Sequence, residues 1–115
     1  MLALDGMHAE EHPIILSEFG GIALVADGTW GYSRCSSPAE LQERYTKLLG
    51  TVHRLELLAG FCYTQFSDTY QEANGLLYAN REPKFPLERI AAATSGEATR
   101  PYEPRQLDAP RSEHD

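Results

Sequence analysis

One acidic residue near the start of the chain stands where an enzyme could use it. Glu18 follows a run of branched apolar residues, Ile14–Leu16, and two glycines come soon after it. The apolar run predicts a buried strand of a parallel sheet that is covered on both faces, with Glu18 closing the strand. An ionised carboxylate at such a place costs free energy unless it is paired, solvated from one side or used in chemistry. Because ligands bind at the carboxyl ends of strands in α/β proteins, Glu18 is a candidate catalytic group, with an ordinary surface residue as the alternative.

A second stretch ends in the same way. Residues 60–63 are apolar and aromatic, which favours another strand, and polar side chains follow it directly. These polar residues are Thr64, Gln65, Ser67, Asp68 and Thr69. Two consecutive strands whose carboxyl ends both become polar indicate one shared face for binding or catalysis.

Together the two stretches resemble a known enzyme family. Residues 15–21, Ile-Leu-Ser-Glu-Phe-Gly-Gly, and residues 30–33, Trp-Gly-Tyr-Ser, are similar to the region of strand seven in family 2 glycoside hydrolases. That family includes β-galactosidases, β-glucuronidases and β-mannosidases. Residues 60–69, with Asn-Gly-Leu-Leu at 74–77 and Arg-Glu-Pro-Lys at 81–84, are similar to strand eight and its exit. The resemblance covers about His12 to Ala93 and keeps both motifs in the expected order.

The resemblance implies that Glu18 is the nucleophile of a retaining β-glycosidase. Its carboxylate would attack the anomeric carbon of a β-glycoside, and a second carboxyl group roughly 5–5.5 Å away would act as acid and then as base. In the family, that partner is a glutamate that follows an asparagine at the end of strand four. No Asn-Glu dipeptide occurs in this chain, so the acid/base residue is missing and the isolated chain is expected to be inactive.

The same resemblance implies further contacts with the sugar. Many family members place a tryptophan late in strand eight, beneath the sugar, whereas this chain has Thr64 there with Gln65 beside it. Trp30 or Tyr32 is then expected to supply the apolar platform, with loop packing as the alternative for Trp30. Asp68 is expected to hydrogen-bond within its loop or to a sugar hydroxyl, and replacement of the missing acid/base by Asp68 is the less favoured interpretation.

The chain is too short for the whole of that fold. It has 115 residues, whereas a (β/α)8 barrel typically needs about 250. We therefore predict an α/β fragment, the last two βα units (strands seven and eight) of a TIM barrel. The expected organisation is an irregular lead-in over 1–12, a partial catalytic domain over 13–93 and a flexible tail over 94–115, where prolines and charges dominate.

Between the two strands the sequence predicts one helix with a clear start. Ser37 is a good N-cap, Pro38 suits the first helical position and Glu40 completes a capping box. An apolar stripe with helical spacing would pack on the sheet, and the helix is expected to end near Glu56. The stripe consists of Leu41, Tyr45, Leu48, Leu49, Val52 and Leu55.

After the second strand the sequence predicts loops and one short helix. Residues 75–78 are expected to return as a short extended piece. The helix is expected over 87–93, with Leu87 and either Ile90 or Ala91 facing inward. Within the earlier connection over 20–36, an Asp-Gly pair at 27–28 is expected to form a turn.

The cysteines and one histidine pattern carry weaker signals. Cys62 is expected to be a small buried residue in mid-strand and Cys35 a free, exposed thiol in a loop, without a disulfide between them. Residues 8–12 fit the H-x-x-E-H pattern of some zinc peptidases, but Pro13 biases His12 away from helical geometry. A solvated polar segment is therefore favoured over a metal site, and no cofactor is expected.

Composition and charge narrow the class of partner. Hydrophobic residues make up 42% of the chain, which supports a globular core, and ten basic against seventeen acidic residues give a net charge of −7. That balance argues against nucleic acid and anionic membranes as partners, since both require clustered cations. The expected ligand is a carbohydrate, and the remainder of the barrel or a second copy is expected to cover the exposed sheet.

Two further questions stay open at this point. The first residues have neither the basic start nor the apolar length of a signal peptide, which favours the cytoplasm slightly without fixing the compartment. The alternative to an enzyme fragment is a stand-alone α/β interaction or scaffold module in which Glu18 is merely structural.

Overall fold

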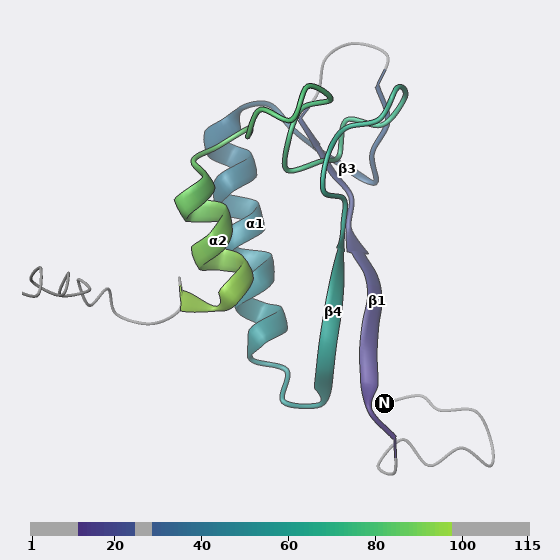
Figure 1. Cartoon of the computed structure of the whole chain (residues 1–115), viewed down its shortest axis with the longest axis vertical. Helices are drawn as coiled ribbons and strands as arrows, with labels where there is room; N and C mark the ends of the chain where they lie inside the picture. The colour runs from purple at the N-terminus through teal and green to yellow at the C-terminus, as the bar shows by residue number, and fades with distance from the viewer. Residues whose placement is uncertain (1–11, 25–28, 98–115) are drawn as a thin grey trace, which may run out of the picture.

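The computed structural model describes residues 12–24 and 29–97. Its elements in chain order are β1 (Ile14–Gly20), β2 (Ile22–Leu24), β3 (Ser33–Cys35), α1 (Pro38–His53), β4 (Leu58–Thr64) and α2 (Leu87–Ser95). β1 pairs with β4 and β2 pairs with β3, each pair in parallel. The described part is therefore a small α/β domain with two short parallel sheets and two helices. Figure 1 shows the helices packed beside the β1–β4 pair.

β1 and β4 pair with an irregular register. Leu16–Phe19 spans three residue steps in β1 and lies opposite Phe61–Tyr63, which spans two steps in β4. The extra residue forms a β-bulge that includes Glu18, and such bulges often re-aim a side chain beside an active site. The prediction that Glu18 closes the strand is wrong by two residues, because β1 continues to Gly20, which pairs with Thr64.

Helices cover one face of the β1–β4 sheet. Both helices lie on the same side of the two strands (Figure 1), and rings of α1 meet rings of β4 edge to face. Tyr45 lies 4.8 Å from Tyr63, and His53 lies 5.3 Å from Phe61, between ring centroids.

The other face of that sheet is uncovered in the part of the chain that the structure describes. Its exposed side chains are Ile15, Ser17, Glu18 and Cys62, and Ile15 is 62% exposed. The prediction of a strand covered on both faces is therefore wrong for the described residues. Parallel sheets are normally buried on both sides, so this face is the unusual feature of the fold.

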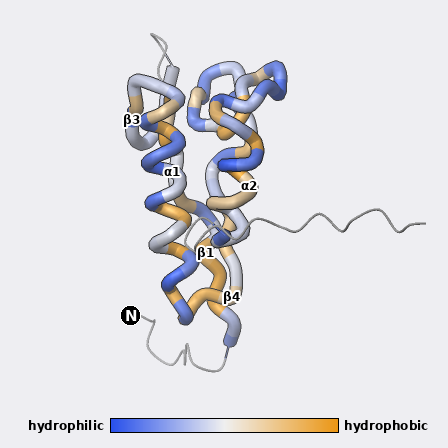
Figure 2. Tube along the Cα trace, turned by 90° about the vertical axis from the view of Figure 1, so that its left-hand side faces the viewer, coloured by the Kyte–Doolittle hydropathy of each residue, from blue (hydrophilic) through white to orange (hydrophobic). Residues whose placement is uncertain are grey.

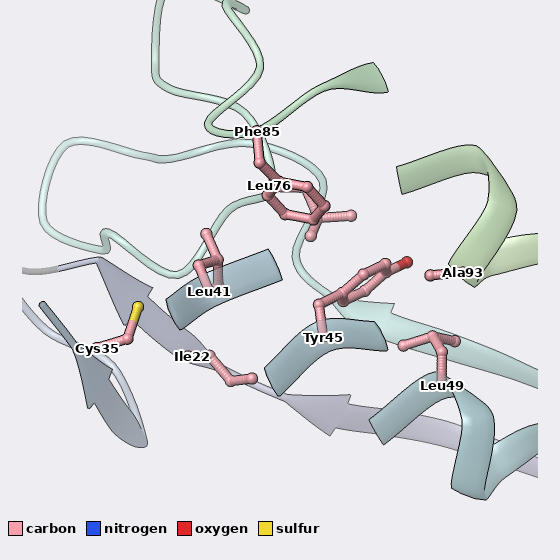
Figure 3. Close-up of a cluster of buried hydrophobic side chains, with 8 residues drawn as sticks. All are labelled: Ile22, Cys35, Leu41, Tyr45, Leu49, Leu76, Phe85 and Ala93. Atoms are coloured by element: carbon pink, nitrogen blue, oxygen red, sulfur yellow. The ribbon is translucent and has the colours of Figure 1, made fainter. Parts of the chain in front are cut away.

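A cluster of eight buried side chains forms the core between α1, the shorter sheet and the loop after β4 (Figure 3). Its members are Ile22, Cys35, Leu41, Tyr45, Leu49, Leu76, Phe85 and Ala93. Tyr45 is 1% exposed, its ring contacts Phe85, and its hydroxyl hydrogen-bonds to the hydroxyl of Thr94 at 2.7 Å. One side chain of α1 thus joins the sheet, the loop and α2.

α1 begins as the sequence predicts and ends three residues earlier. The hydroxyl of Ser37 accepts a hydrogen bond from the N–H of Glu40 at 3.1 Å, which caps the helix. The Glu40 carboxylate accepts from the N–H and hydroxyl of Ser36 rather than of Ser37, and the N–H of Ser36 lowers the pKa of Glu40. Hydrophobic and hydrophilic residues alternate in short groups along the helix (Figure 2). Leu55, predicted as the last residue of the apolar stripe, lies beyond the end of the helix at His53 and is exposed.

The short second helix is confirmed and runs two residues further than predicted. α2 contacts α1 along a narrow strip in which Ile90 is partly buried and Ala93 is buried. Ile90, one of the two predicted alternatives, therefore faces inward and Ala91 does not, whereas the prediction for Leu87 is wrong because it is 57% exposed. The reason is the spacing of positions 90 and 93, which lie on one side of the helix. Neither described helix is long and apolar enough to cross a membrane.

The pairing of β2 with β3 reverses the predicted environments of the two cysteines. Cys35 ends β3, is 3% exposed and donates a weak hydrogen bond from its thiol to the carbonyl of Ala23 at 3.4 Å. Cys62 is exposed because it lies on the uncovered face of β4. Both thiols are free, as predicted. The turn predicted at residues 27–28 lies outside the described residues.

This reversal predicts a large difference in thiol reactivity. Iodoacetamide at pH 8 is expected to alkylate Cys62 at least about ten times faster than Cys35, because burial raises the pKa of Cys35 and shields its sulfur. Peptide mapping by mass spectrometry after timed quenching measures both rates. In Cys62→Ser, labelling of the native chain should nearly cease and return in urea. Equal rates at the two thiols would contradict the described burial.

Candidate functional site

The connections that follow β1 and β4 lie together at the carboxyl ends of these strands (Figure 1). Main-chain hydrogen bonds join them. The N–H of Gly21 donates to the carbonyl of Thr64 at 2.7 Å, the N–H of Trp30 donates to Gln71 at 3.0 Å, and Ala73 donates to Trp30 at 3.1 Å. The two strand ends therefore share one face, as their polar sequences predict.

Glu18 lies in the bulge of β1, on the uncovered face of the sheet. Its side chain is exposed, and Cys62 is the β4 residue opposite the bulge. Neither of the two ion pairs found within the described residues includes Glu18. The carboxylate is thus open to approach from solvent and unclamped by a cation, a geometry that suits a nucleophile and also an ordinary surface residue.

The two glycines after Glu18 turn the chain sharply into the next loop. Gly20 has φ 101° and Gly21 has φ 67°. Residues that carry a side chain rarely adopt such positive φ angles. A Cβ atom at Gly20 would collide with the ring of Tyr63, and one at Gly21 would collide with the ring of Tyr32. Glycine at both positions therefore allows two aromatic rings to pack directly on the main chain beside the candidate nucleophile.

Trp30 and Tyr32 form an exposed aromatic pair. Their ring centroids lie 4.7 Å apart with an interplanar angle of 66°. Trp30 is 48% exposed and Tyr32 is 68% exposed, although the main chain of both is hydrogen-bonded. The N–H of Tyr32 donates to the carbonyl of Gly21 at 2.9 Å, which fixes the pair next to the end of β1. Fixed backbone and exposed rings are what a stacking platform for a sugar requires.

Thr64 and Gln65 lie where β4 meets its loop, and the peptide bond between them is cis. The N–H of Gln65 donates to the carbonyl of Asn74 at 3.2 Å, and the N–H of Leu76 donates back to Gln65 at 3.1 Å. The side-chain nitrogen of Gln65 and the side-chain oxygen of Asn74 are both buried without a hydrogen-bond partner in the described part. One donor and one acceptor therefore remain unused at the end of β4, although neither atom is accessible from solvent in this structure.

Asp68 is held inside the loop by a buried ion pair. Its Oδ1 accepts from the N–H of Gly75 at 2.9 Å and from Nζ of Lys84 at 2.7 Å. Lys84 is 4% exposed and also donates to the carbonyl of Ala73 at 2.9 Å. A Cβ atom at Gly75 would collide with the main chain of Ser67 and Asp68, so the loop closes tightly here. The predicted hydrogen bonding of Asp68 within its loop is confirmed, while its contact with a sugar hydroxyl stays a prediction.

Two residues near the site, the buried Lys84 and the partly buried Tyr63, were not predicted to have a role there. Lys84 is the cation that holds Asp68; it belongs to the Arg-Glu-Pro-Lys motif at 81–84, but that motif gives no indication of this role. Tyr63 packs on Gly20, and burial raises the pKa of its hydroxyl. Both residues position the loops and do not face the exposed carboxylate of Glu18.

All six predicted site residues lie at the carboxyl-terminal end of β1 and β4 or in the adjoining loops: Glu18, Trp30, Tyr32, Thr64, Gln65 and Asp68. Asp68 is engaged by Lys84, whereas Glu18 and the aromatic pair are exposed. Within residues 12–24 and 29–97, no group of three or more His, Cys, Asp or Glu side chains could hold a metal ion. Most of the zinc-like pattern, residues 8–11, lies outside the described residues.

No protein-family model matches the chain, and no curated protein is significantly similar to it. The geometry of the site therefore has to carry any functional proposal.

Proposed function

We propose that this chain is the C-terminal part of the catalytic barrel of a retaining β-glycosidase of family 2, with Glu18 as its nucleophile. β1 and β4 would be strands seven and eight, and α1 the helix between them. The parallel pairing of β1 and β4, with α1 between them in the sequence, is the relation that neighbouring strands have in a (β/α)8 barrel, and the short strands β2 and β3 lie within the connection from β1 to α1.

The observation that carries this proposal is the position of the Glu18 carboxylate. It projects from a bulge near the carboxyl end of a parallel strand, on the face that the helices leave open. In a barrel, helices pack outside the sheet and catalytic groups come from the carboxyl ends of strands. An exposed carboxylate on the uncovered face therefore corresponds to a group that reaches into the mouth of the barrel.

The proposed reaction has two steps. An oxygen of the Glu18 carboxylate forms a bond to the anomeric carbon while the bond to the leaving oxygen breaks, and an acid protonates that oxygen. Water then attacks the anomeric carbon, gives its proton to the same group acting as base, and releases Glu18 as a carboxylate. Because that acid/base residue would come from strand four, outside this chain, the isolated chain should not hydrolyse glycosides.

Neighbouring groups would bind the sugar. The exposed rings of Trp30 and Tyr32 offer a platform for the apolar C–H face of the ring. The amide nitrogen of Gln65 has no hydrogen-bond partner and would donate to a sugar hydroxyl once the side chain turns this buried atom outward. Thr64 stands beside it at the end of β4, and Asp68 would act through the loop that it holds.

Mechanism-based labelling tests the proposal on the complete enzyme to which this segment would belong. A 2-deoxy-2-fluoro β-glycoside with a dinitrophenolate leaving group should form a stable glycosyl ester, because fluorine slows the second step. Peptide mapping by mass spectrometry is expected to find the ester on Glu18. Glu18→Gln should remove the adduct, while Glu43→Gln, which changes an exposed glutamate of α1, should leave it unchanged. An adduct on any other residue would defeat the assignment.

A non-catalytic α/β interaction or scaffold module is the second candidate. The engagement of Asp68 by Lys84 favours it, since Asp68 is then not free to act as a second catalytic carboxylate. Sedimentation of the purified chain separates the two cases. A stable, well-folded monomer would favour the module, whereas association or partial folding is expected of a barrel fragment with an open sheet.

A further inference from the structure

An open groove of about 460 Å³ lies along one flank of α1. Its lining comes from α1 and from the ends of the first three strands: Gly20, Ile22, Ser33, Arg44, Lys47, Leu48 and Thr51. The α1 side chains that meet α2 are different ones, because Tyr45 and His53 hydrogen-bond to Thr94. The groove is thus on the flank of α1 that α2 does not occupy.

The groove continues into a free strand edge. β1 pairs with β4 along one edge, and its other edge has no partner strand among the described residues. Gly20, the last residue of β1, also lines the groove. A free edge is a template for another strand, and the neighbouring helix of that strand would then lie over the groove.

The chemistry of the groove is apolar in its floor and cationic at its rim. Ile22 is buried and Leu48 partly buried, while Arg44 and Lys47 are exposed on α1. Arg44 donates to Glu40 at 2.6 Å, but a guanidinium group has five N–H donors and can bind a second carboxylate. The chain has a net charge of −7, but the rim of this groove is positively charged. An occupant with an apolar face and acidic side chains would complement both the floor and the rim.

We propose that the groove binds an acidic amphipathic helix, the one that precedes β1 in the rest of the barrel. Its apolar stripe would pack on Ile22 and Leu48, and its carboxylates would pair with Arg44 and Lys47. The inference rests on the proposed function for the origin of the helix, since in a barrel the helix before a strand packs beside the helix after it. It goes beyond that function by assigning the residues that select the partner.

Three synthetic peptides of about 18 residues, long enough to form a helix alone, provide the probe. They share one leucine and alanine stripe and carry Glu, Gln or Lys on both sides of it. Fluorescence anisotropy of each labelled peptide is followed as the purified chain is added. The Glu peptide is expected to bind saturably, the Gln peptide about ten times more weakly, and the Lys peptide not at all. Raising the salt concentration should weaken the Glu peptide most.

Variants of the chain assign the binding to the groove. Arg44→Gln with Lys47→Gln should weaken the Glu peptide about ten-fold, to the level of the Gln peptide. Arg89→Gln, an exposed cation of α2, should leave the affinity unchanged. Equal affinity of the three peptides, no saturable binding, or an equal loss in Arg89→Gln would overturn the proposal.

Other occupants give their own results. A concentration-dependent dimer that Arg44→Gln with Lys47→Gln abolishes would show that a second copy fills the groove, and tighter peptide binding after removal of residues 1–11 would show that the chain fills it itself. Either result would overturn the proposal. Peptide binding does not require hydrolysis, so an adduct on Glu18 without peptide binding rejects only the docking helix. Peptide binding with an adduct elsewhere rejects only the nucleophile.

Discussion

Lys84→Met is expected to lower the free energy of unfolding by about 2–4 kcal/mol, because it leaves a largely buried carboxylate unpaired. The Lys84 side chain is fully buried and that of Asp68 is 15% exposed, so little water can replace the lost ammonium group. The loop after β4 also loses the bond from Nζ to Ala73. Urea unfolding followed by tryptophan fluorescence and circular dichroism measures the change.

Two matched variants make this measurement specific. Arg44→Met breaks the exposed pair with Glu40 and should cost less than about 1 kcal/mol. Lys84→Met combined with Asp68→Leu should recover part of the loss, since replacing both partners removes the unpaired charge. Similar losses for Lys84→Met and Arg44→Met would contradict the buried pair. Hydrogen exchange should meanwhile speed up at the amide of Gly75, which donates to Asp68.

Tyr45→Ala is expected to cost about 3–5 kcal/mol, the range for truncation of a large buried side chain. The ring lies against Tyr63 of β4 and Phe85 of the following loop, so its removal opens a cavity where three parts of the fold meet. Figure 3 shows Tyr45 within the buried cluster that includes Phe85. Thermal unfolding should show a much lower midpoint, or no cooperative transition.

Tyr45→Phe is the control for that cavity. It keeps the ring and loses only the hydrogen bond to Thr94, so it should cost about 1 kcal/mol. If Tyr45→Phe and Tyr45→Ala were equally destabilising, the hydroxyl rather than the ring would be the source of stability, and the described packing would be wrong.

The longer elements were predictable because each has a local signal. The Ser37 cap and apolar stripe predict α1, and apolar runs predict β1 and β4. β2 and β3 have three residues each, too few for a periodic pattern, and they exist because the main chain pairs across a long connection. The burial of Ile22 from β2 and Cys35 from β3 in the core was therefore also unpredictable from the sequence.

The sequence predicts where the candidate residues lie in the sheet but not what surrounds them. The polar endings of the two strands predict that Glu18 and Asp68 lie at the same end of the β1–β4 sheet, as they do in the structure. Whether a single residue is buried depends on which face other elements cover, and a local pattern does not encode that. For this reason Cys35 and Cys62 were assigned in reverse, and the role of Lys84 was missed.

Because of its extra residue, β1 both packs against the core and presents two adjacent side chains to solvent. Leu16 and Phe19 are both partly buried although they are three positions apart, which regular alternation of side chains would forbid. Two consecutive positions between them, Ser17 and Glu18, point to solvent and contribute nothing to the packed interior. Substitutions there can change the groups that the strand presents to solvent while folding is left intact, so these two positions can vary without any change in the packing that supports them.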